Sequence, residues 1–129
     1  MRFLLVEDEM PLRELYSELL EDEGHSVTAM SDGCEAKRRI LNEVCDMILL
    51  DIILPHLNGL RILESVRKNP KNKNFHTPIF LLTNLAQDEI VTECMSFGAL
   101  GFLLKSNYNP EEFIIAVRAF LKQSNNEKK

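Results

Sequence analysis

Short apolar runs alternate along the chain with longer segments in which apolar residues recur every three or four positions. The short runs are typical of strands, and the longer segments are typical of helices with one buried face. The predicted strands are Phe3–Val6, His25–Met30, Met47–Leu50, Pro78–Thr83 and Leu100–Leu104. The predicted helices contain the apolar positions of 12–20, 36–41, 60–66, 90–95 and 113–121. The pattern is therefore a strand followed by a helix, repeated five times.

Capping residues support several of these boundaries. Gly24 and Gly98 follow apolar helical patterns and are typical helix stops. Ser31-Asp32-Gly33 is predicted to cap the second helix. Asn109 followed by Pro110, with Glu112 three residues after the asparagine, predicts the start of the last helix.

Regular alternation of strands and helices predicts an α/β fold with a parallel sheet and helices on both faces. We expect five strands in the order 2-1-3-4-5. No linker or second apolar core is evident, so residues 1–122 are predicted to form one domain and residues 123–129 a polar tail that frays.

Composition narrows the functional class. The chain has 129 residues and a net charge of −5, which argues against a dedicated nucleic-acid-binding domain. No apolar run is long enough to span a bilayer, and the acid at Glu7 comes too early for a secretory signal, so we expect a cytoplasmic protein without membrane contact. Cys34, Cys45 and Cys94 have no metal-type spacing and are predicted to be buried free thiols.

Polar residues follow the predicted strands that would lie near the switch point of the sheet. Glu7 and Asp8 follow the first strand, and Asp51 follows the third. Thr83 ends the fourth strand and Lys105 follows the fifth. Because ligands bind at the carboxyl ends of strands in such sheets, we expect these five side chains to share one rim.

Three carboxylates at one rim need a cation, since like charges about 4 Å apart repel by about 4 kcal/mol at an effective dielectric constant near 20. Oxygen ligands without His or Cys favour Mg²⁺, with Mn²⁺ or Ca²⁺ as the next choices. With Lys105 and a dication, the rim is neutral and can accept an anion. Asp51 is then a candidate nucleophile toward a phosphoryl group. Taken singly, Glu7 and Asp8 are also explained as helix-start charges and Asp51 as a turn residue, and a lone Thr83 or Lys105 at a strand end usually has no function.

The chain resembles the receiver domain of bacterial two-component response regulators, and in length the single-domain chemotaxis type. The resemblance extends from Arg2 to about Leu121. It rests on Leu-Val-Glu-Asp-Glu at 5–9, Asp51-Ile-Ile-Leu-Pro55 with Gly59, Leu-Leu-Thr at 81–83 and Gly-Phe-Leu-Leu-Lys at 101–105. It implies a flavodoxin-like fold and a phosphorylation-activated signalling switch.

The resemblance also implies roles for single residues. Asp51 matches the phosphoacceptor, Lys105 the lysine that pairs with the phosphoryl group, and Thr83 with Phe102 the switch pair. The implied Mg²⁺ ligands are Asp8 directly, Glu7 largely through water, Asp51, and the main-chain carbonyl of Ile53. The implied phosphoryl donor is a phosphohistidine on a sensor histidine kinase or a phosphotransfer protein. Such a protein catalyses its own phosphoryl transfer without being a conventional turnover enzyme.

Four positions depart from the family pattern. Ser106 replaces the usual proline after the lysine, and Asn84 replaces a small residue after Thr83. Ile53 and Leu85 are apolar, and they stand at the two positions whose side chains border the path of the hydrolytic water in the family. We therefore expect a long-lived phosphorylated state.

Other functions are compatible with parts of this pattern. A pseudo-receiver would act only as a protein-interaction module, but the set of acidic, hydroxyl and lysine residues is intact. An aspartate-dependent phosphatase would need an acid at Ile53, and an FMN carrier would need a phosphate loop where Glu7 and Asp8 stand. Output is expected through the face of the fourth helix, fifth strand and fifth helix, by a monomer or weak dimer. The chain could also be part of a longer regulator.

Overall fold

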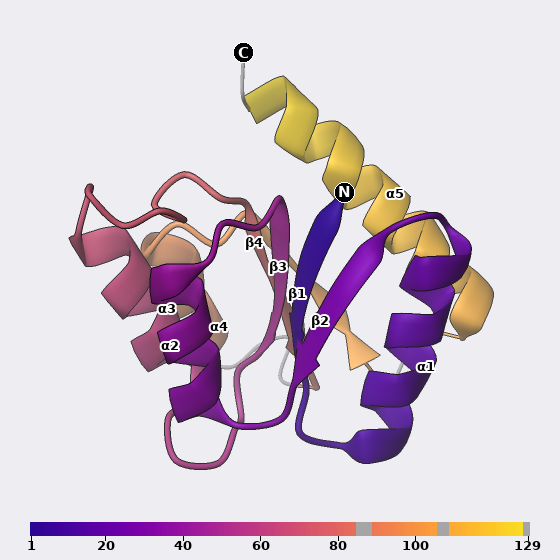
Figure 1. Cartoon of the computed structure of the whole chain (residues 1–129), viewed down its shortest axis with the longest axis horizontal. Helices are drawn as coiled ribbons and strands as arrows, with labels where there is room; N and C mark the ends of the chain where they lie inside the picture. Colours follow the sequence, from indigo (N-terminus) through magenta and orange to yellow (C-terminus); the bar gives the residue numbers. More distant parts are fainter. Residues whose placement is uncertain (85–88, 106–108, 128–129) are drawn as a thin grey trace.

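Five strands form one parallel sheet in the part of the chain that the computed structural model describes, which is residues 1–84, 89–105 and 109–127. The strands are β1 (Arg2–Val6), β2 (Ser26–Met30), β3 (Met47–Asp51), β4 (Ile79–Thr83) and β5 (Gly101–Leu104). Their order across the sheet is β2-β1-β3-β4-β5, and neighbouring strands run parallel (Figure 1). The predicted fold class and strand order are confirmed.

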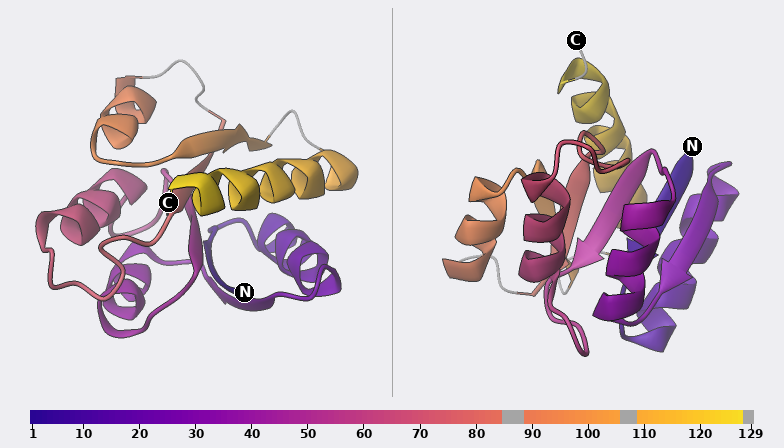
Figure 2. Two further views of the ribbon diagram at one scale, coloured as in Figure 1. Left: turned by 90° about the horizontal axis from the view of Figure 1, so that it is seen from above. Right: turned by 60° about the vertical axis from the view of Figure 1, so that its left-hand side comes forward.

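Helices cover both faces of the sheet. They are α1 (Met10–Asp22), α2 (Gly33–Asn42), α3 (Gly59–Lys68), α4 (Glu89–Ser96) and α5 (Pro110–Glu127). Figures 1 and 2 show α1 and α5 on one face and α2, α3 and α4 on the other. None of the described helices is both long and apolar enough to cross a membrane.

The core consists of two apolar layers, one on each face of the sheet. Leu4, Val6, Ile48 and Leu50 pack in the layer shared with α2, α3 and α4. Their neighbours along the strands pack in the layer shared with α1 and α5; they include Phe3, Leu5, Met47 and Leu49. Every residue of β3 is buried, as expected for a central strand covered on both sides.

The predicted caps are present. The Asp32 side chain accepts hydrogen bonds from the amides of Cys34 and Glu35, at 2.8 and 3.1 Å. The Asn109 side chain accepts one from the amide of Glu112 at 2.8 Å. Gly24 ends α1 with a φ of +91°, a conformation that favours glycine.

The predicted end of the last helix is wrong. The tail was expected to fray after residue 122, but α5 continues to Glu127. The Gln123 side chain donates a hydrogen bond to the carbonyl of Leu100 at 2.9 Å, and Ser124 is buried. These contacts hold a polar segment in the helix, and the assignment of residues 1–122 as the domain stays a prediction.

The predicted burial of the cysteines is only partly correct. Cys94 is buried and Cys45 is half-buried, but Cys34 is exposed because it lies in the first turn of α2, facing solvent. Burial raises the pKa of Cys94 to about 11 and that of Cys45 to about 12, so both thiols stay protonated.

Arg67 lies in the last turn of α3. Its guanidinium donates hydrogen bonds to the carbonyls of Asn74, Phe75, Thr77 and Gly98. It therefore ties α3 to the segments that precede β4 and β5.

Gly33 is required by a close backbone contact. A Cβ at this position would lie 1.7 Å from the carbonyl oxygen of Leu57, so the loop after β3 would have to move. We expect Gly33→Ala to lower the free energy of unfolding by about 3 kcal/mol, as in severe overpacking. Urea denaturation measures this change.

Gly24→Ala is the matched control, because a Cβ at Gly24 meets nothing within 4 Å. It should cost only about 1–2 kcal/mol, from the positive φ alone. Equal losses in the two variants would contradict the steric explanation for Gly33.

Candidate functional site

The register of the sheet brings the predicted polar residues to one rim. Val6 lies beside Leu50, so the residues that follow them, Glu7 and Asp51, are neighbours. Thr83 in β4 lies beside Leu104 in β5, and Leu104 is the residue before Lys105. Four strands with a common direction therefore deliver their carboxyl ends to the same edge.

A buried ammonium group connects two buried carboxylates at this rim. Lys105 Nζ lies 2.8 Å from Asp51 Oδ2 and 3.0 and 3.3 Å from the two carboxylate oxygens of Glu7. The side chains are nearly inaccessible, with exposures of 6% for Lys105, 3% for Asp51 and 0% for Glu7. Pairs buried to this degree are screened little by water or salt.

Backbone and side-chain donors hold the acidic groups in place. The amide of Ile53 donates to Asp51 Oδ1 at 3.2 Å, and the amide of Glu9 donates to Glu7 Oε2 at 3.1 Å. Arg13, from the first turn of α1, donates to the carbonyls of Glu7 and Asp8 at 3.0 and 3.3 Å. The loop between β1 and α1 is thus fixed where its carboxylates project.

One lysine does not balance these charges. Burial, and then the charge of Asp51, raises the pKa of Glu7 to about 7. Burial also raises the pKa of Asp51, although the hydrogen bond from Lys105 opposes it. Burial disfavours charge on Lys105, but its hydrogen bonds to Asp51 and Glu7 prevail and raise its pKa. The rim retains excess negative charge that a further cation would neutralise.

The carboxylates are arranged suitably for a hard metal ion. Glu7, Asp8 and Asp51 each place an oxygen within 4.8 Å of the other two, and Asp8 is exposed to solvent while the other two are buried. These donors are all carboxylate oxygens, the ligand type that Mg²⁺ prefers. The residues present therefore fit a magnesium ion.

An open hollow of about 270 Å³ gives access to the carboxylates. Its described lining residues are Asp8, Glu9, Asp51, Ile53, Asn84 and Lys105. Ile53 is 60% exposed and presents an apolar side chain at the mouth. Asp51 thus lines a hollow that is open to solvent, although only 3% of its side chain is exposed.

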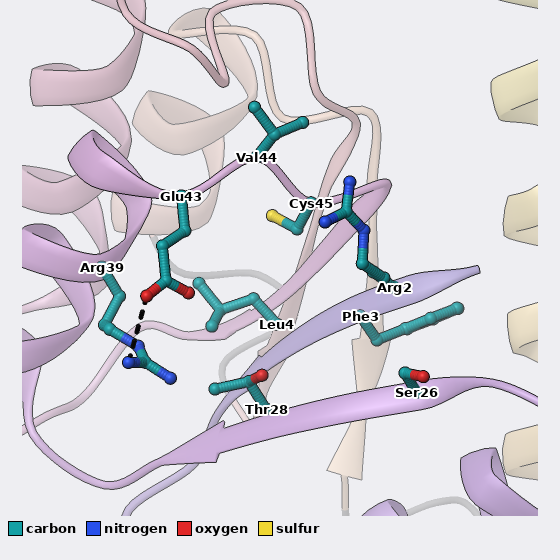
Figure 3. Close-up of a pocket in the computed structure, with 9 residues that line it drawn as sticks. All are labelled: Arg2, Phe3, Leu4, Ser26, Thr28, Arg39, Glu43, Val44 and Cys45. Atoms are coloured by element: carbon teal, nitrogen blue, oxygen red, sulfur yellow. Dashed lines mark ion pairs between the residues drawn. The ribbon is translucent and has the colours of Figure 1, made fainter.

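A larger hollow, of about 530 Å³, lies at the amino-terminal ends of β1 and β2 (Figure 3). Its charges are partly paired internally, since Arg39 Nη1 lies 3.2 Å from Glu43 Oε1. It lacks the convergent carboxylates and lysine of the rim. Chemistry, rather than size, therefore identifies the rim as the candidate functional site.

The structure brings together most of the predicted site residues. Thr83 is buried at the end of β4, whereas Phe102 is 38% exposed and its ring lies outside the core. Leu85 and Ser106 lie outside the described residues, so the expectations for them stay predictions. The hydrogen bonds of Glu9 and Arg13 at the rim were not predicted from the sequence. Their positions directly after Glu7 and Asp8, in the turn and in the first turn of the helix, could have indicated that they support these two residues.

We expect Lys105→Met to lower the free energy of unfolding by about 3–5 kcal/mol, because it leaves Glu7 and Asp51 buried without their counterion. Urea denaturation of the metal-free protein measures the change. Adding Asp51→Asn to this variant should restore part of the loss. Lys122→Met, which replaces an exposed lysine, is the control. A Lys105 variant as stable as the Lys122 variant would contradict the proposed balance of charge.

Comparison with known proteins assigns the chain to a family. Residues 3–118 match the model of the response regulator receiver domain. The chain is 36% identical over 123 residues to the transcriptional regulatory protein CpxR homolog of Haemophilus influenzae, covering 95% of this chain and 51% of that protein. The chain thus spans about half the length of the curated relatives it matches.

Solved structures agree over nearly the whole chain. A CheY-like receiver domain protein from Methanospirillum hungatei superposes with a TM-score of 0.84 and 25% identity, covering 98% of this chain and 97% of that one. The receiver domain of a sensor histidine kinase from Pseudomonas aeruginosa gives a TM-score of 0.80 and 27% identity, covering 94% and 97%. That structure has a magnesium ion coordinated in its active-site cleft. The chain therefore belongs to the response regulator receiver domain family.

Proposed function

We propose that this chain is a phosphorylation-activated signalling switch that accepts a phosphoryl group on Asp51 from a phosphohistidine of a histidine kinase or phosphotransfer protein. The observation that carries this proposal is the contact of Lys105 Nζ with Asp51 at 2.8 Å beside the carboxylates of Glu7 and Asp8. The match of residues 3–118 to the receiver family supports it.

In the proposed transfer, a carboxylate oxygen of Asp51 attacks phosphorus and a P–O bond forms. The P–N bond of the phosphohistidine breaks, and its electron pair leaves with the imidazole nitrogen. Lys105 offsets negative charge on the phosphoryl oxygens, and the hydroxyl of Thr83 donates a hydrogen bond to one of them. Such positioning and charge stabilisation are the main requirements of phosphoryl transfer.

The proposal assigns the metal to the acidic rim. Asp8 and Asp51 would bind Mg²⁺ directly, Glu7 largely through water, and Ile53 through its main-chain carbonyl. When bound, the ion neutralises the carboxylates and the incoming phosphoryl oxygens. Mn²⁺, which accepts the same oxygen ligands, is proposed to substitute for it.

Signalling would follow from a shift between two conformations. Thr83 moves toward the phosphoryl group, and Phe102, whose ring is partly exposed in this structure, turns inward behind it. We propose that a downstream protein reads this change at the face formed by α4, β5 and α5. The proposal further includes a cytoplasmic monomer or weak dimer with no nucleic acid bound directly.

The alternative of a pseudo-receiver has little support. Such a protein would need neither a buried lysine bridging two carboxylates nor an aspartate that lines an open hollow. Ile53 stands where an aspartate-dependent phosphatase would need an acid, and the carboxylates of the β1–α1 loop would repel the phosphate of FMN.

We expect incubation with acetyl phosphate and Mg²⁺ to add one phosphoryl group, detected by intact-protein mass spectrometry. Asp51→Asn should abolish the gain because it removes the nucleophile, and Asp8→Asn should reduce it. Asp22→Asn replaces an exposed aspartate at the end of α1 and should leave it unchanged.

Chelation of divalent ions should abolish the gain, and Mn²⁺ should restore it. An unmodified parent chain with bound Mg²⁺ would favour the pseudo-receiver instead. Phosphorylation that persists in the Asp51 variant would place the acceptor at another residue.

The apolar side chain of Ile53 at the mouth of the hollow predicts slow hydrolysis, since it cannot orient the attacking water. Ile53→Asn should shorten the lifetime of the phosphorylated state by about 3- to 10-fold, which corresponds to about 0.7–1.4 kcal/mol in the barrier. Leu85→Glu should act in the same direction. A dephosphorylation time course measures both effects.

Ile115→Asn is the matched control, because Ile115 is 63% exposed, similar to Ile53, but lies on α5. It should leave the lifetime unchanged. If neither Ile53→Asn nor Leu85→Glu accelerates hydrolysis, the explanation by water orientation is wrong.

A further inference from the structure

A separate hollow of about 440 Å³ lies at the opposite edge of the sheet from Asp51. Pro78 and Leu100, which line it, directly precede β4 and β5. The end of α3 and the last turns of α5 complete the wall. Its volume is within the range of about 300–1,000 Å³ that is usual for small-molecule sites.

The hollow has a positive group without an acidic partner. The guanidinium of Arg67 donates to the carbonyls of Thr77 and Gly98 at 3.0 and 3.3 Å, and to two further carbonyls. None of the ion pairs found between described residues includes Arg67, and no acidic residue is among the described lining residues. Its charge is therefore offset only by the dipoles of neutral carbonyls.

A buried hydroxyl on the same wall also lacks a partner. Ser124 is 0% exposed, and its Oγ has no hydrogen-bond partner among the described residues. A hydroxyl group can donate one hydrogen bond and accept others. Burying such a group without a partner is unfavourable, so its presence beside a hollow indicates a ligand atom that it can bond.

The remaining wall has both apolar and polar parts. Phe75, Pro78 and Leu100 contribute to it, and the ring of His76 lies edge-on to that of Phe75 at 4.9 Å between centroids. This composition separates the hollow from the one in Figure 3, where Arg39 is paired with Glu43 inside the hollow. The apolar side chains of Phe75, Pro78 and Leu100, next to the cation of Arg67 and the hydroxyl of Ser124, suit a molecule that has an apolar body and an anionic end.

We propose that this hollow is a second binding site, for a small organic carboxylate. The carboxylate accepts a hydrogen bond from the Ser124 hydroxyl in the positive field of Arg67. The apolar body packs against Phe75, Pro78 and Leu100. The inference is independent of phosphorylation at Asp51, because the residues involved lie at the other edge of the sheet.

The test is a titration of the full chain with benzoate, followed through the amide NMR signals of Gly98, Leu100 and Ser124. We expect saturable shifts at millimolar concentrations. Benzamidine, a cation of similar shape, should bind at least about tenfold more weakly because Arg67 repels it. Inorganic phosphate, which lacks the apolar body, should also bind more weakly than benzoate.

Ser124→Ala should raise the dissociation constant of benzoate about fivefold, the usual effect of losing one hydrogen bond. Ser96→Ala, which removes a hydroxyl bonded to the carbonyl of Glu93 on α4, should leave it unchanged. A dispersed amide spectrum establishes that each variant is folded. Failure to saturate, equal affinity for benzamidine, or unchanged affinity in the Ser124 variant would overturn the proposal.

Discussion

The contact of one buried ammonium group with two buried carboxylates is the interaction on which the functional rim depends. Lys105 is 98 positions from Glu7 and 54 from Asp51 in the sequence, yet it bonds both side chains. Transferring such ions from water costs several kcal/mol each, so the cluster is tolerated only because the three groups satisfy one another. The same contact holds Asp51 in place at the floor of an open hollow.

Parallel topology is what makes this arrangement possible. Each strand ends in the same direction, so β1, β3, β4 and β5 deliver their following residues to a single edge. The hydrophobic layers on both faces then keep water away from the cluster. Low hydration raises the pKa of Glu7 and Asp51 and strengthens the attraction to any added cation. The buried carboxylates therefore lower the stability of the folded protein at the site where the phosphoryl transfer is proposed to occur.

The opposite edge of the sheet has a different physical role. Asn74, which is buried there, donates to the carbonyls of Ile40 and Glu43, and its side-chain oxygen accepts from the amide of Cys45. Arg67 similarly connects α3 to the loops before β4 and β5. These polar contacts are mainly structural. The proposed carboxylate site differs in having the Ser124 hydroxyl, which has no hydrogen-bond partner among the described residues, on the same wall as the positive charge of Arg67.

The sequence by itself determined the alternation of strands and helices, because periodicity and caps are local properties. It also indicated the acidic rim, because the residues that follow parallel strands all lie at one edge of a sheet. It did not determine that α5 includes residues 123–127, that Cys34 is exposed, or that Arg67 donates hydrogen bonds to the carbonyls around it. Nor did it indicate the support that Arg13 gives to the β1–α1 loop or the partly exposed ring of Phe102. Only the tertiary structure decides these features, because each depends on the direction of a side chain and on neighbours distant in sequence, which periodicity does not encode.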